Sequence, residues 1–150
     1  MRVTLHRSPS LDAAALAAVR AADLGPLLRR SGDVLGVPPR SGLALRLADD
    51  PELRALNARH AGTDRATDVL AFPGERGWVG DIAISVPRAC GQNPSDPAAE
   101  LRLLAVHGLL HCLGHDHGDP SSAARMTAET RRLLPGEPVP DLGADHSEPG

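Results

Sequence analysis

Residues 107–117, HGLLHCLGHDH, constrain the chain most, because they hold four of its seven histidines. His107 and His111 are four residues apart, so on a helix both imidazoles project from the same face, one turn apart. Gly114 allows the chain to leave the helix and turn back, which would bring His117 to the same place from a third direction. Three neutral imidazoles leave a fourth position for water, the arrangement typical of catalytic zinc. The segment therefore predicts a site for one zinc ion at His107, His111 and His117.

Two further polar residues of this segment have a less direct role in the predicted site. His115 follows Gly114 directly and has less chain in which to turn than His117, so we place it behind the ligands or on the surface. Asp116 is expected either to orient a ligand imidazole from behind or to lie in a solvated turn.

The histidine spacing also matches the metal signature of the metzincin proteases, H-x-x-x-H-x-x-G-x-x-H. Those enzymes carry a glutamate directly after the first histidine, where it acts as the general base. Gly108 occupies that position here and can do no acid–base chemistry. A bound zinc ion lowers the pKa of its water to about 7, so hydrolysis near neutral pH is the expected chemistry. A metalloprotease remains an alternative, disfavoured by Gly108.

Three segments, one of them the histidine segment, resemble the YbeY family of bacterial rRNA-maturation factors. HGLLHCLGHDH resembles that family's H-G-x-L-H-L-x-G-Y-D-H signature. LNARHAGTDRATDVLAFP and VGDIAIS are similar to two other motifs of the family. The resemblance extends over residues 40–134. The resemblance implies a zincin-like metallohydrolase fold in which His107, His111 and His117 bind zinc. It implies a metal-dependent endoribonuclease that processes small-subunit rRNA ends and serves ribosome quality control, with rRNA and the small ribosomal subunit as partners.

The chain departs from the family pattern at an arginine thought to serve catalysis or RNA contact. Ala61 stands in place of that arginine, and Thr63 in place of the lysine that follows. Arg59 and Arg65 are close by in sequence, and either guanidinium could hold a phosphate and stabilise charge in the transition state. We expect one of them to be catalytic, with a solvated loop arginine as the alternative for each. Ala61 also favours a second hypothesis, a ribosome-assembly factor whose metal is mainly structural.

The hydrophobic pattern predicts an α+β domain at residues 1–134, with a small mixed sheet of about four strands packed with about five helices. Prolines and acidic residues predict a disordered acidic tail at 135–150. Strands are expected at 2–6, 43–49, 68–73 and 79–86, and helices at 10–30, 51–60, 97–113 and 121–134, with a helical turn after Pro87.

Charge and composition limit the partners. The net charge is −3, and the last sixteen residues contain four acidic residues and no arginine, so the domain is near neutral. RNA binding would therefore need a local patch. No stretch approaches the roughly 20 apolar residues of a membrane span, and two cysteines do not make a disulfide framework. We expect a cytoplasmic protein without an organic cofactor.

Overall fold

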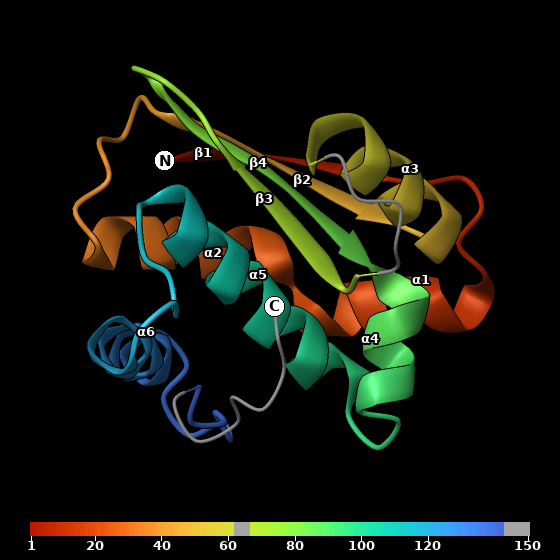
Figure 1. Ribbon diagram of the computed structural model, residues 1–150. Coiled ribbons are helices and arrows are strands. Elements are labelled where there is room, and N and C mark those ends of the chain that lie inside the picture. The colour runs from red at the N-terminus through yellow and green to blue at the C-terminus, as the bar shows by residue number, and fades with distance from the viewer. Residues whose placement is uncertain (62–66, 143–150) are drawn as a thin grey trace.

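The computed structural model describes residues 1–61 and 67–142 and shows helices packed against a single sheet (Figure 1). The sheet has four strands in the order β1-β2-β4-β3, in which β1, β2 and β4 are parallel and β3 is antiparallel to β4. The α+β class and the four-stranded mixed sheet are therefore confirmed. The elements are β1 (Arg2–Arg7), α1 (Ala13–Ala22), α2 (Leu24–Val34), β2 (Gly42–Ala48), α3 (Asp50–Ala61), β3 (Val69–Pro73), β4 (Trp78–Ser85), α4 (Val86–Gln92), α5 (Pro97–Cys112) and α6 (Pro120–Leu133).

The two faces of the sheet are covered unequally. Strand side chains alternate between faces, and one face carries the large buried residues, packed with α1, α2, α4 and α5 into the main core. The other face is covered by α3, whose Leu53 packs against Ala48 and Ala83 in a small second core (Figure 1). The strands contribute five fully buried residues to the main core: Leu43, Leu45, Leu47, Ile82 and Ile84.

Helix α5 runs through the middle of the main core. Asp96 caps its N-terminus by accepting a hydrogen bond from the backbone N–H of Ala99 (3.1 Å), and Pro97 follows in the first turn, where a missing N–H costs nothing. Half of its residues are buried between the sheet and the neighbouring helices, and the other half are partly buried. Gly108 lies so close to the sheet that an added Cβ would stand 2.7 Å from Cγ2 of Ile82. The fold thus fixes α5 firmly against β4.

The helix expected at 10–30 is wrong in two respects. It begins at Ala13, with Asp12 as its N-cap, and it is broken at Asp23, which adopts the left-handed conformation (φ 50°, ψ 57°). In a continuous helix the ring of Pro26 would clash with the preceding turn and remove a hydrogen bond. The break instead places Pro26 in the first turn of α2.

The final helix begins one residue before the predicted start. Its N-cap is Asp119, which accepts a hydrogen bond from the backbone N–H of Ser122 (2.8 Å), and Pro120 is its first residue. The chain that follows, 135–142, belongs to the stretch expected to be a disordered tail, yet it lies against α5 and α6. Residues 143–150 are outside the described part of the chain.

Three contacts hold residues 135–142 in place. Arg102 of α5 donates from Nε to the Glu137 carboxylate (2.9 Å), Arg131 donates to the carbonyl of Val139 (3.2 Å), and the N–H of Leu142 donates to Thr127 Oγ1 (3.1 Å). Val139 and Leu142 also pack against the main core. Composition alone missed this because the two apolar residues are spaced among prolines and acidic groups.

None of the helices formed by the described residues is long and apolar enough to cross a membrane.

Candidate metal centre

The C-terminal end of α5 determines where the histidines lie. Gly114, at φ 98°, ends the helix in a Schellman motif, in which its N–H donates to the carbonyl of His111 (3.0 Å) and the N–H of His115 donates to that of Leu110 (2.9 Å). The left-handed glycine reverses the chain, as its position in the sequence predicts. The reversal brings His117 back to the last turn of the helix.

The three imidazoles predicted as ligands lie together. One ligand nitrogen from each of His107, His111 and His117 falls within 4.8 Å of the other two. The ring centroids are 4.8 Å apart for His107 and His111, 5.9 Å for His107 and His117, and 5.6 Å for His111 and His117. A tetrahedral zinc ion with bonds of 2.0–2.1 Å would separate its nitrogens by about 3.3 Å. Small side-chain rotations would close that gap, so the donor set fits one ion.

The surroundings keep two of these imidazoles neutral. Burial, followed by the neighbouring His111 and His117, lowers the pKa of His107 to about 4. Burial and His117 also lower the pKa of His111 below its ordinary value. Metal binding requires the unprotonated ring, so at neutral pH both residues are ready to act as ligands.

His115 and Asp116 lie beside the three imidazoles. Asp116 accepts a hydrogen bond from the N–H of Gly118 (3.1 Å), and its charge partly offsets the lowering of the pKa of His111 by burial and His117. His115 and Asp116 also line a shallow pocket between the turn and α6. Their roles behind the ligands stay predictions.

No contact of the described residues brings Arg59 to the histidines. Arg59 is exposed near the end of α3, the helix on the opposite face of the sheet from α5. Arg65 and Thr63 are outside the described residues, and Ala61 is the last residue of α3. The catalytic roles of Arg59 and Arg65 stay predictions.

Gly108 explains why no glutamate follows the first histidine. The position is buried against the sheet, and an added Cβ would meet Ile82 at 2.7 Å, with two further contacts at 3.2 Å. A glutamate there would have to push α5 away from β4. The packing therefore requires a glycine where a metzincin has its base.

Cys112 follows a candidate ligand but lies against the sheet. Its Sγ would be 2.6 Å from a Cβ added to Gly80, which itself adopts φ 156°. Burial, and then the charge of Asp81, raise the pKa of this thiol to about 11. Cys112 is therefore a packing residue.

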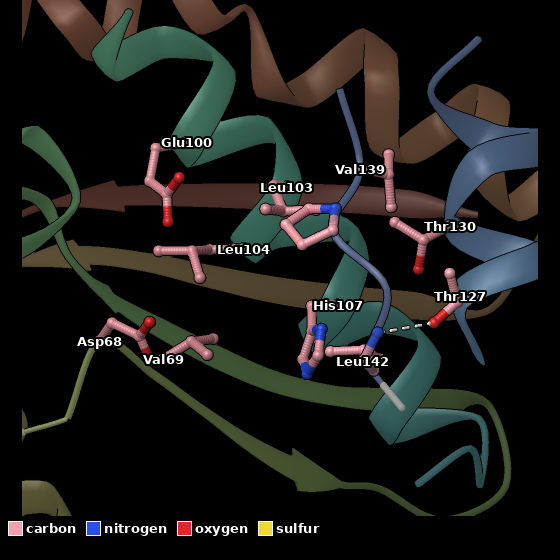
Figure 2. Close-up of a pocket in the computed structure, with 11 residues that line it drawn as sticks. Asp68, Val69, Glu100, Leu103, Leu104, His107, Thr127, Thr130, Val139 and Leu142 are labelled. Carbon is pink, nitrogen blue, oxygen red and sulfur yellow. Dashed lines mark hydrogen bonds between the residues drawn. The ribbon is translucent and has the colours of Figure 1, made fainter. Parts of the chain in front are cut away.

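Sequence reasoning missed a pocket beside the histidines. A cavity of about 200 Å³ has His107 in its lining and two carboxylates, Asp68 and Glu100, on one side (Figure 2). Gln92 donates from its side-chain amide to Glu100 (2.8 Å) and to Asp68 (3.3 Å). Burial raises the pKa of Glu100, while the hydrogen bond from Gln92 lowers it. Glu100 could have been suspected, since it lies two turns before His107, but the approach of Asp68 depends on the tertiary structure.

Known proteins resemble this chain in sequence and in fold. The family model described as Endoribonuclease YbeY matches residues 22–136. Curated relatives named Endoribonuclease YbeY include those of Gloeobacter violaceus, 45% identical over 63% of this chain and 56% of the relative, and Moorella thermoacetica, 37% identical over 75% and 83%. The match thus spans little more than half of the Gloeobacter protein. A solution structure from Thermotoga maritima shares the fold, with a TM-score of 0.53 and 21% identity over 89% of this chain and 85% of that one. The chain belongs to the YbeY family.

Proposed function

We propose that this chain is a zinc-dependent endoribonuclease that cuts phosphodiester bonds during maturation of small-subunit rRNA and in ribosome quality control. One observation carries the proposal: a chain of the YbeY family brings one ring nitrogen each of His107, His111 and His117 to within 4.8 Å of one another. The relatives carry the name endoribonuclease, which supports RNA as the substrate class. The proposed partners are rRNA and the small ribosomal subunit, and the proposed compartment is the cytoplasm.

The three histidines would hold one zinc ion. Zinc in such a site supplies Lewis-acid stabilisation of phosphoryl oxygens and activates water near neutral pH. His107 and His111 come from one helix that is packed against the sheet, so their relative position is rigid. His117 follows a turn closed by backbone hydrogen bonds. Neutral imidazoles on this framework favour binding at physiological pH.

The remaining roles belong to residues around the triad. Arg59 or Arg65 would hold the phosphate in place of the arginine that the family carries at position 61, because a guanidinium can donate two parallel hydrogen bonds to phosphate. Asp116 would hold the ring of His111 in orientation, which is supported by its electrostatic effect on that residue. His115 would lie behind the ligands.

The test measures metal content and cleavage together. Protein prepared without a His-tag or chelator is examined by mass spectrometry for zinc, and the same samples are incubated with a precursor of the small-subunit rRNA. The variants are His111→Ala, Arg59→Ala and Arg65→Ala, with the exposed Arg40→Ala as the matched control for loss of one positive charge. We expect one zinc per chain, loss of zinc and cleavage in His111→Ala, and weakened cleavage in one arginine variant but not in Arg40→Ala.

Three results would overturn the nuclease. A precursor that metal-loaded protein leaves uncut, as His111→Ala does, would exclude the activity. Stoichiometric zinc without cleavage, together with binding to small subunits that survives loss of the metal and of His117, would identify the assembly factor that Ala61 favours. Cleavage of unstructured protein, abolished by chelation, would instead revive the metalloprotease.

A further inference from the structure

The pocket beside the candidate metal centre combines an apolar lining with an acidic side. Leu103, Leu104 and Val69 line its interior, and Val139 and Leu142 contribute from the C-terminal segment (Figure 2). The carboxylates of Asp68 and Glu100 lie near each other on one side, joined by the amide of Gln92. The volume of about 200 Å³ admits a flat ring rather than a large group.

The pocket lies close enough to the histidines for one substrate molecule to contact both places. Glu100 and His107 are seven residues apart on α5, so they lie on one face of the helix and about 10 Å apart along its axis. That is the scale on which the base of a nucleotide lies away from its own phosphate. A phosphate at the histidines therefore places the attached base within reach of the pocket.

The chemistry of the lining excludes a phosphate from the pocket and favours a base. Two carboxylates repel a phosphate, whereas the apolar walls accept the faces of an aromatic ring. Gln92 occupies part of the acceptor capacity of Asp68 and Glu100 and leaves the rest for donors of a ligand. Single-stranded RNA is read in this way, by stacking of a splayed base and hydrogen bonds to its edge, and carboxylates accept from the exocyclic amino group of cytosine.

We propose that this pocket binds the base next to the scissile phosphodiester and selects bases with an exocyclic amino group, guanine, adenine or cytosine, over uracil. The inference rests on the proposed endoribonuclease function. Asp68 and Glu100 accept from the amino group, while the carbonyl oxygens of uracil face these carboxylates unfavourably. The apolar side chains hold the ring in the orientation that presents its edge.

One wall of the pocket comes from a part of the chain beyond the family match. The match ends at residue 136, whereas Val139 and Leu142 line the cavity. The ion pair of Arg102 with Glu137 and the hydrogen bond from Leu142 to Thr127 hold this wall against α5 and α6. Base selection is thus a property that this chain's own C-terminal segment helps to determine.

The test uses short single-stranded RNAs that differ only in the bases flanking the cleaved bond. The ratio kcat/KM is measured for each RNA with the zinc-loaded wild type, with Glu100→Gln and with Val139→Phe, which fills the pocket from the C-terminal wall. Glu75→Gln, in the exposed β3–β4 turn, is the matched control. We expect the wild type and the control to prefer amino-bearing bases on the order of tenfold over uracil.

The variants should change selectivity in a defined way. Glu100→Gln replaces an acceptor by a group that also donates, so it should move the preference toward uracil, and Val139→Phe should remove the preference. Cleavage with the same base profile in the wild type and both variants would overturn the pocket and leave the nuclease intact.

A second measurement separates this inference from the proposed function. Binding of adenosine, guanosine, cytidine and uridine 5′-monophosphates is measured by calorimetry on the same proteins. Weaker binding of the uridine nucleotide, lost in Glu100→Gln, would support the base pocket even if no RNA were cut. Equal binding of all four nucleotides would overturn the base pocket. Cleavage of protein, with a preference for particular side chains in the substrate, would also overturn it.

Discussion

The candidate metal centre and the pocket beside it are neighbours that share His107, yet they are assembled differently. The three imidazoles come from one segment of eleven residues, closed by a helix end and a glycine turn. The pocket takes its lining from the start of β3, from α5, from α6 and from residues 139–142. The histidine cluster of the candidate metal centre is encoded by local spacing, whereas the pocket exists only when the whole domain is folded. Substitutions should therefore affect the two regions separately, except on α5, which carries both.

The largest effect should come from His111→Ala, which breaks the metal centre and leaves the pocket. Loss of a residue that hydrogen-bonds to a metal ligand already lowers metal affinity by about 10–100-fold. Removal of a ligand itself should therefore weaken zinc binding by about 100-fold or more. Competition with a chromophoric chelator measures this change. Zinc affinity equal to that of the wild type would show that the triad is not the site.

Gly108→Ala should damage both regions, because it strains the helix that they share. The added methyl would stand 2.7 Å from Ile82, and overpacking of this kind costs about 1–3 kcal/mol of unfolding free energy, measurable by urea denaturation. Gly91→Ala in α4 is the matched control, since nothing lies within 4 Å of its added Cβ. The control should gain up to about 1 kcal/mol from helix propensity. Equal stability of the two variants would contradict the close packing of α5 on the sheet.

Glu137→Gln should loosen the pocket while sparing the metal centre. Its ion pair with Arg102 is partly buried, with both side chains about a quarter exposed, so its loss should cost about 0.5–1 kcal/mol. Amide hydrogen exchange over residues 137–142 should become faster, with zinc affinity unchanged. Glu129→Gln removes the more exposed pair with Arg132 and should leave this exchange unaltered. Unchanged exchange in Glu137→Gln would mean that the hydrogen bonds from Arg131 and Leu142, together with the apolar contacts, hold the wall without this ion pair.

The smallest effect concerns the pH dependence of Glu100. Burial raises the pKa of Glu100 in the folded protein above the ordinary 4.5. The folded state therefore favours the protonated carboxyl group, and the stability that this group contributes is fully present below pH 4.5 and is lost as the pH rises through the folded pKa. Glu100→Gln, which stays neutral, should therefore melt slightly higher than the wild type at pH 7, and this advantage should vanish below pH 4.5. An advantage that is constant with pH would contradict the burial of the charged group.

The same division decides what could be predicted from the sequence. Helix spacing and Gly114 were sufficient for the triad, and alternating apolar residues were sufficient for the four strands, because both patterns are local. The break at Asp23 escaped the pattern, since the alanine-rich run hides the effect of Pro26. The contact of residues 137–142 with α5 and the approach of Asp68 to Glu100 join segments far apart in the chain. The spacing of residues within one segment cannot predict contacts between distant segments.

The buried thiol of Cys112 has a consequence for the redox behaviour of the protein. The thiolate is the form that oxidants attack, and at a pKa of about 11 only about one thiol in ten thousand is ionised at pH 7. Burial also raises the pKa of Cys90. The three candidate ligands are imidazoles without sulfur, so oxidants that attack thiolates have no target among them, unlike in a cysteine-ligated zinc site.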